Sequence, residues 1–172
     1  FAAATDYRGI AGRQLSDPLA ATTADLDKAE KRTFNQLRAA QKADHEQFFS
    51  RVTLRLPETA NSRLPTDERL AACRAGAKDP ALMALFVNMG RYLLIGSSRP
   101  GGLPANLQGI WAEEIHTMWN GDWHFNINVQ MNYWPALVCN MVELHEPIIS
   151  LIESLVEPGT KTAKAYYDSP GW

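Results

Sequence analysis

The stretch "DPALMALFVNMGRYLLIGSSRPGG", residues 79–102, decides the fold class of this chain. Asp79 is a typical helix N-cap, and Pro80 suits the first helical position, where no backbone N–H partner is required. Apolar residues then recur every three or four positions, which is the helical period. They are Leu82, Leu85, Phe86, Met89, Tyr92, Leu93 and Ile95. Because "GSSRPGG" is rich in breakers, the helix is predicted to end there.

The sequence before this helix predicts two further helices. Thr22 or Thr23 can cap a helix that continues with helical spacing to about Val52. The alternating "RVTLRLPET" then predicts a short extended segment, and Thr66 can cap a short helix with acidic residues in its first turn. The first 20 or so residues resemble the end of a strand and a connector.

The sequence after this helix predicts a long loop and then more helix. No periodicity persists from Gly96 to about Asn132, and a loop of that length in a compact domain is usually functional. Helices are predicted to restart at Pro135 and at Pro147, and Pro158-Gly159 is predicted to break the second. The last predicted helix runs from a cap at Thr160 to Tyr167. We expect about six helices, little sheet and a helical bundle or barrel.

Composition and charge exclude several classes of function. The 172 residues are 45% apolar and 21% charged, which is ordinary for a globular protein. The net charge is −2 and the lysines and arginines are scattered, which argues against a nucleic-acid or anionic membrane surface. Apolar runs such as "ALMALFV" are shorter than a bilayer requires, so no membrane span is predicted. "FAAATDYRGI" has no initiator Met, so we expect a piece of a longer protein whose location stays open. Cys73 and Cys139 are expected to be buried free thiols rather than a disulfide.

No metal or cofactor site is predicted. "HEPII" at 145–149 lacks the second histidine of a zinc-protease helix, and His116 and His124 stand eight apart in a loop. The nucleotide, phosphate and serine-hydrolase motifs GxGxxG, P-loop and GxSxG do not occur.

The segment "WNGDWHFNINVQMNYWPA", residues 119–136, carries the strongest chemical signal. Uncharged amides occupy every second position, at Asn126, Asn128, Gln130 and Asn132, following His124. In an extended segment these side chains would share one face, and the apolar residues between them would anchor the other. A buried amide without partners costs about 1–3 kcal/mol, so the row needs internal partners or a ligand. Sugars are such ligands, because their hydroxyls both donate and accept hydrogen bonds; a structural amide ladder is the alternative.

Two long motifs resemble one family of enzymes. "GRYLLIGSSRPGGLPANLQGIW", Gly90 to Trp111, followed by "WNGDWHFNINVQMNYWPA", is similar to the family 95 glycoside hydrolases, and "RLPTDERL", "DPALMALF", "HEQFFSRVTLRL" and "YYDSPGW" fit the same family. The resemblance covers nearly the whole chain. Members of this family are inverting α-L-fucosidases that act chiefly on α-1,2-linked fucose.

The resemblance implies a mainly α fold, a partial (α/α)6 barrel. Residues 1–21 would be the end of a β-sandwich domain and a connector, and residues 22–172 would be the N-terminal portion, about half, of the barrel. A half-barrel would expose apolar helix faces and could self-associate. The resemblance is compatible with an extracellular or periplasmic location, with any signal peptide outside this fragment.

The resemblance also implies the site. The catalytic pair of asparagines matches Asn126 and Asn128, and His124 matches a residue that contacts fucose. The family's acid glutamate and its assisting aspartate would lie beyond Trp172, so the isolated chain is expected to be inactive.

Substrate contacts are also expected from Trp123, Asn120 and Trp111, although packing is an alternative for the tryptophans. The expected substrate is a fucosylated oligosaccharide or glycan, with no nucleic acid, membrane, metal or cofactor. Two alternatives stay open: a non-catalytic carbohydrate-binding or remnant domain, and an α-L-galactosidase of the same family.

Overall fold

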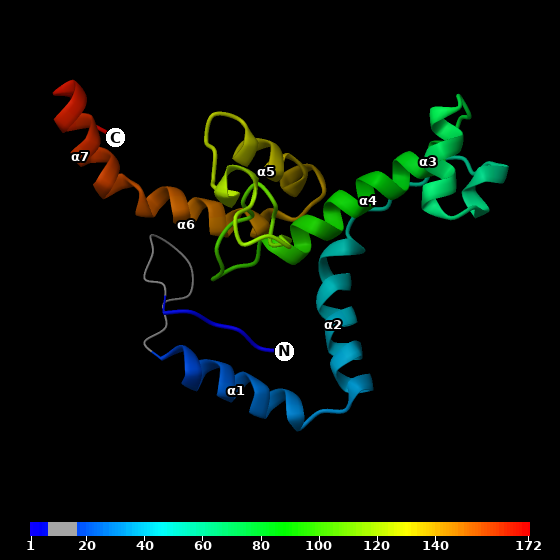
Figure 1. Ribbon diagram of the computed structural model, residues 1–172, viewed down its shortest axis with the longest axis horizontal. Helices are drawn as coiled ribbons and strands as arrows, with labels where there is room; N and C mark the ends of the chain where they lie inside the picture. The colour runs from blue at the N-terminus through cyan, green and yellow to red at the C-terminus, as the bar shows by residue number, and fades with distance from the viewer. Residues whose placement is uncertain (7–16) are drawn as a thin grey trace.

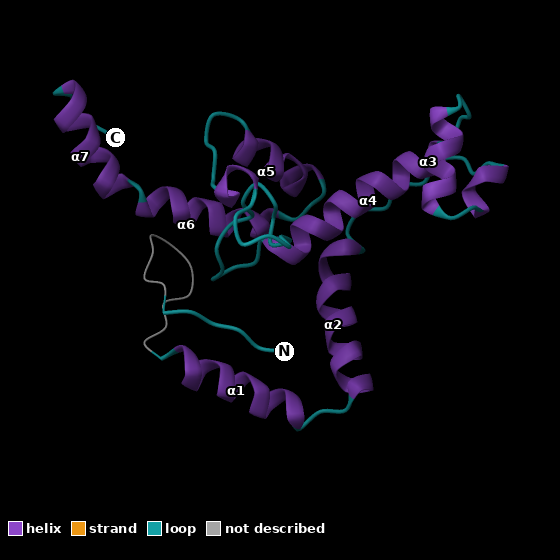
Figure 2. Cartoon of the chain, viewed as in Figure 1, coloured by secondary structure: helices purple, strands orange, loops and turns teal. Residues whose placement is uncertain are grey.

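The computed structural model describes residues 1–6 and 17–172. Helices dominate this described part, which contains no β-strand and only one isolated bridge, between Asn106 and Gly109 (Figure 2). The α-helices are α1 Pro18–Glu30, α2 Phe34–Phe49, α3 Thr66–Arg74, α4 Pro80–Ser97, α5 Asn128–Val138, α6 Glu146–Ser154 and α7 Val156–Tyr167. Short 3₁₀ turns are η1 Ala60–Arg63, η2 Met118–Gly121 and η3 Val142–His145. The prediction of a mainly helical chain is confirmed, and the (α/α)6 barrel stays a prediction.

Local signals placed α4 correctly. Asp79 accepts a hydrogen bond from the backbone N–H of Leu82, and Pro80 occupies the first helical position. The helix ends at Ser97, within "GSSRPGG". α3 begins at Thr66, but its N-cap is Pro65, so Thr66 is the first helical residue rather than the cap.

The predicted single helix from Thr22 to Val52 is wrong. Two helices occupy that region, because the sequence contains two separate caps. Asp17 accepts from Ala20 N–H and starts α1, whereas Thr33 and Gln36 form a reciprocal capping box that starts α2. α1 therefore begins inside the predicted connector; residues 1–6 form no strand, and the rest of the predicted strand lies outside the described residues.

The predicted break at Pro158-Gly159 is also wrong. α7 runs through both residues, because Pro158 is the third residue of the helix, where a backbone N–H has no intrahelical partner to lose. Gly159 N–H donates to Leu155 O at 2.8 Å and continues the ladder. Thr160 is consequently an interior residue of α7 and does not cap it.

The core lies where α4 meets α2 and α5, and where η3 meets α5 and α6. Figure 1 shows α4, α5 and α6 gathered centrally, with α3 and α7 at opposite ends. Arginine side chains contact the C-terminal end of α2 and connect it to this core. The Phe48 ring lies against the guanidinium groups of Arg51 and Arg99, at 4.7 and 4.3 Å, and Arg91 donates to Phe49 O at 2.6 Å.

α4 is longer than the apolar run within it suggested. Its 18 residues and mean hydropathy of 1.2 satisfy the length and composition of a membrane span, so the argument that the apolar runs are too short does not hold. However, a third of that window is buried, α4 packs against α2 and α5, and its interior Arg91 is 2% exposed. These contacts are those of a core helix, and the absence of a membrane partner stays a prediction.

The chain exposes an unusually large surface. Its accessible area is 12612 Å², whereas a folded monomer of 19.1 kDa exposes about 8,400 Å². The excess of about 4,200 Å² is as large as an obligate protein interface. Large apolar side chains contribute to it, among them Phe86, Trp134, Leu137 and Val138, which are 61–80% exposed.

We expect the isolated 172-residue chain to self-associate, because apolar surface of this extent is unstable in water. Light scattering over a concentration series should show a mass that rises above that of the monomer. A monomeric mass throughout the series would contradict the open arrangement of these helices.

A buried ion pair joins α3 to the start of α4. Arg69 donates to both carboxylate oxygens of Asp79, at 2.7 and 2.9 Å. These hydrogen bonds from Arg69, together with the N–H of Leu82, hold the pKa of Asp79 below its ordinary value of 3.8. The ionised carboxylate is therefore both the N-cap of α4 and the partner of a buried guanidinium.

We expect Asp79→Asn to destabilise the chain most near neutral pH. Because the folded state holds the Asp79 pKa below its unfolded value, the stabilisation is complete above about pH 4 and is lost as the pH falls through the folded pKa. Urea unfolding of both proteins from about pH 7 to about pH 3 should show their free energies of unfolding converging as the pH falls. A difference that is independent of pH would contradict this role.

Candidate active site

The amide row is not extended, and this prediction is wrong. α5 begins at Asn128, where Val129 N–H donates to His124 O and Met131 N–H donates to Ile127 O. The buried face of this helix is formed by Val129, Tyr133 and Ala136. Their spacing of four and three is helical, and burying these three residues against the core prevails over the alternation of the sequence.

The four amides consequently have different surroundings. Gln130 Nε2 donates to Phe125 O at 2.6 Å, and Asn132 Nδ2 donates to Asn106 O at 2.9 Å. The side chains of Asn126 and Asn128 have no hydrogen-bond partner within residues 1–6 and 17–172. Asn126 is exposed, and Asn128 is half-buried as the first residue of α5. Two amides of the row thus brace the chain, and two are free to bind something else.

His124 lies just before these free amides. Its side chain is 32% exposed, and its ring meets the Trp119 ring edge-on at 6.0 Å. Its Nε2 lies 3.8 Å from a carboxylate oxygen of Asp122. The ring is therefore held on one side, while part of it reaches the surface.

A left-handed turn introduces this segment. Trp119, Asn120 and Gly121 have φ angles of 56°, 55° and 62°. Left-handed backbone costs about 1–2 kcal/mol per ordinary residue and is unusual for a bulky one such as Trp119. Hydrogen bonds from Asn120 N–H to Thr117 O and from Asp122 N–H to Trp119 O close the turn. Asn120 is exposed on it, four residues before His124.

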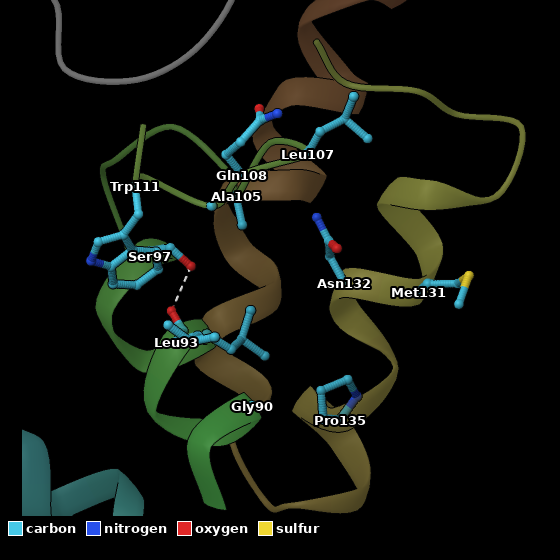
Figure 3. A pocket seen from close by; sticks show the side chains of 12 residues that line it. Gly90, Leu93, Ser97, Ala105, Leu107, Gln108, Trp111, Met131, Asn132 and Pro135 are labelled. Atoms are coloured by element: carbon cyan, nitrogen blue, oxygen red, sulfur yellow. Dashed lines mark hydrogen bonds between the residues drawn. The ribbon is translucent and has the colours of Figure 1, made fainter. Parts of the chain in front are cut away.

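The two remaining predicted contacts, Trp123 and Trp111, serve packing. Trp123 Nε1 donates to Pro104 O at 3.1 Å, and its ring packs against the core. The Trp111 ring lies on Gly96 and Gly109, where an added Cβ would come within 3.3 and 2.9 Å of it. Trp111 is still 44% exposed, and it lines a cavity of about 360 Å³ between α4, the loop and α5 (Figure 3).

Two cavities adjoin the predicted site. The 360 Å³ cavity includes Trp111 and Asn132, and a second, apolar one of about 480 Å³ between α5 and α6 includes Phe125 and Gln130. Neither is lined by Asn126 or Asn128. His124, Asn120 and the two asparagines therefore lie in one segment, outside the linings of these two cavities.

Sequence reasoning missed a buried group of hydrogen bonds around Tyr133. Ser98 Oγ donates to Leu144 O at 2.8 Å, so the Tyr133 hydroxyl donates to Ser98 Oγ at 2.7 Å and accepts from Ala105 N–H at 2.9 Å. Burial raises the pKa of Tyr133 above its usual value. The signal was available, because a tyrosine predicted on an apolar face needs a partner for its hydroxyl.

The described residues contain no group of three or more histidine, cysteine or acidic side chains that could hold a metal ion. Cys73 and Cys139 are both free thiols, as expected; Cys139 is buried, and Cys73 is only half-buried.

Residues 33–172 match the family described as "Glycosyl hydrolase family 95 catalytic domain". The chain belongs to this family. The match covers α2 to α7 and thus the whole segment from Trp119 to Ala136.

Relatives in a plant and in fungi carry names from the same class of enzyme. The chain is 39% identical over 161 residues to "Alpha-L-fucosidase 2" of Arabidopsis thaliana, covering 91% of the chain. It is 36% and 33% identical to proteins called "Probable alpha-fucosidase A" from Aspergillus niger and Aspergillus oryzae, over 100% and 99% of the chain. It spans only 19–25% of the length of these three relatives.

We expect Tyr133→Phe to destabilise this family 95 chain by about 1–3 kcal/mol, because it leaves Ala105 N–H without an acceptor and Ser98 Oγ without its donor. Urea unfolding measures the change. Tyr92→Phe is a matched control, because Tyr92 is 47% exposed and its hydroxyl makes no hydrogen bond within the described ranges. Equal stability of the Tyr133→Phe variant and the wild type would contradict the assigned hydrogen bonds.

Proposed function

We propose that this chain is part of an enzyme that hydrolyses terminal α-L-fucosyl linkages in oligosaccharides or glycans, α-1,2 linkages in particular, with inversion of configuration. Membership of family 95 and the names of three relatives support the reaction class. The observation that carries the proposal is that the side chains of Asn126 and Asn128 have no hydrogen-bond partner among the described residues, whereas those of Gln130 and Asn132 in the same segment have one.

The chemistry of inversion explains why free amides matter. An inverting glycosidase protonates the leaving oxygen and activates a water on the opposite face of the sugar, with its acid and base about 6.5–9.5 Å apart. An amide is too weak a base to take the proton itself. Its carbonyl oxygen can accept a hydrogen bond from the water and thereby orient the water's lone pair toward the anomeric carbon. An asparagine whose oxygen was already used inside the protein could not do this.

The position of Asn128 suits this role. It is the first residue of α5, an 11-residue helix with no side-chain cap. Its side chain is half-buried and makes no hydrogen bond within the described residues, so its carbonyl oxygen is unused there. We assign the orientation of water to the Asn128 carbonyl oxygen, with Asn126 sharing it.

The remaining roles follow from exposure. His124, partly exposed and steadied by Trp119, would bind a sugar hydroxyl, and Asn120 would bind from the adjoining turn. Trp111 and Trp123 would contribute only the parts of their rings that packing leaves free. The acid glutamate and the assisting aspartate are assigned to the parent protein outside this chain. Residues 22–172 would form the N-terminal portion of its (α/α)6 barrel, after a connector and the end of a β-sandwich in residues 1–21.

We expect Asn128→Ala in the full-length protein to lower kcat on 2′-fucosyllactose by about 10²–10⁴-fold, and Asn126→Ala to lower it similarly or somewhat less, because a positioned catalytic group contributes this much. KM should change less than kcat, since His124 stays in place. The melting temperature should hardly change, because neither amide has a partner in the described chain to lose.

Asn35→Ala is the matched control, since Asn35 is an exposed amide near the start of α2 that makes no side-chain hydrogen bond within the described ranges. Its kcat should equal that of the wild type. A wild-type kcat in Asn128→Ala, or a rate loss that merely follows unfolding, would contradict the proposal. Assays with an α-L-galactoside, which adds a 6-hydroxyl, determine which sugar is preferred.

A further inference from the structure

One short turn in the long loop contacts both ends of the segment that carries the candidate site. Gln108 Nε2 donates to Met118 O at 3.1 Å, just before the left-handed turn. Asn106 O accepts from Asn132 Nδ2 at 2.9 Å, one helical turn after Asn128. The residues between these two anchors include His124, Asn126 and Asn128. The distance between the ends of the site segment is therefore set by the turn at residues 106–109.

The turn itself is held firmly. Gly109 N–H donates to Asn106 O at 3.0 Å, and Gln108 N–H donates to the Asn106 side-chain oxygen at 2.8 Å. Gly109 has a φ of 66°, and the Trp111 ring leaves no room there for a Cβ. Figure 3 shows Trp111 beside Ser97 at the end of α4, and Asn132 extending from α5 toward the loop that carries Gln108. The turn at residues 106–109 thus packs against the end of α4 and accepts a hydrogen bond from α5.

The left-handed turn packs directly on the same two amides. A Cβ added to Gly121 would lie 3.1 Å from Gln108 Oε1 and 3.4 Å from Asn106 Nδ2. Gln108 Oε1 is buried and accepts no hydrogen bond within the described residues. One N–H of Gln108 Nε2 thus donates to Met118 O, and its Oε1 is covered beside Gly121.

Such a contact explains how the strained turn persists. Trp119 and Asn120 are the costly residues of this turn, since glycine adopts a positive φ freely, and backbone strain of this kind remains only where the surrounding structure over-determines it. The hydrogen bond from Gln108 and the close packing of Gly121 supply that constraint. When the left-handed turn is held in this conformation, it fixes the position of Trp119, whose ring contacts His124. It also fixes the start of the chain segment that leads to the two asparagines.

We infer that Gln108 is a positioning residue for the reaction. With Asn106 it forms a bracket, defined as residues 106–109, that holds the left-handed turn at one end and α5 at the other, so that Asn126 and Asn128 stand where the attacking water is bound. This inference rests on the proposed function. It assigns Gln108 no contact with substrate and makes its effect on turnover depend on Asn128.

The test is a double-mutant cycle in the full-length protein. Gln108→Ala should lower kcat on 2′-fucosyllactose by about 10–10²-fold, because a misplacement near 1 Å costs about that much. Gln108→Met keeps an unbranched chain of similar length without the donor and should lose a similar factor. Gln47→Ala, an exposed amide on α2, should retain the wild-type kcat.

The cycle separates positioning from loss of stability. If Gln108 acts through the asparagines, Gln108→Ala should lower kcat by a clearly smaller factor in an Asn128→Ala background, where only Asn126 is left to be positioned, whereas a merely structural effect would lower it by the same factor in both. Equal factors in the two backgrounds, or a wild-type kcat in Gln108→Met, would overturn the inference and leave the proposed function standing. A wild-type kcat in Asn128→Ala alone would instead overturn the proposed function.

Discussion

A buried chain of hydroxyl groups joins three parts of the molecule. The Tyr133 hydroxyl on α5 donates to Ser98 at the end of α4, and Ser98 donates to Leu144 in η3. Ser98 and Leu144 are fully buried. Because no water reaches these groups, each unmade bond would carry its full desolvation cost, and α4, α5 and η3 must meet in one arrangement. The direction in which α5 leaves the core, and with it the position of Asn128, follows from this junction.

In the candidate site, the side chains that brace the backbone are different from those that are available to bind a ligand. Hydrogen bonds from Gln130, Asn132 and Gln108 satisfy backbone oxygens of the loop and of the left-handed turn. The side chains of Asn126 and Asn128 take no part in this support. A segment rich in amides can thus be rigid and still offer unused hydrogen-bonding groups, which is the requirement for recognising a sugar or a water.

The success of sequence-based prediction depended on whether the deciding interaction was local. The start of α4 could be predicted because Asp79 and Pro80 act within one helical turn. The division between α1 and α2 was readable in Thr33 and Gln36, although the continuous apolar spacing concealed it. The helical state of the amide segment was not readable, because Val129 and Tyr133 fit a strand and a helix equally well. The buried hydroxyl of Tyr133 depends on Ser98 and Ala105 as partners, and these lie 35 and 28 residues earlier in the chain. Which amides of the row find a partner among the described residues likewise depends on tertiary structure, because a distant acceptor such as Asn106 O must lie within reach of the side chain.

The division of the amide row also has an evolutionary consequence. Gln130 and Asn132 each use only their donor N–H groups toward a backbone oxygen, so another side chain with a donor at the right reach could replace them. Asn126 and Asn128, by contrast, would be selected for an unused carbonyl oxygen, which no lysine or arginine supplies. Four similar residues within one segment are therefore exposed to different selection. In enzymes that descend from a common ancestor, substitutions should accumulate at the bracing amides first, and a drift to donor-only side chains at Asn126 and Asn128 should mark lineages that have lost catalysis.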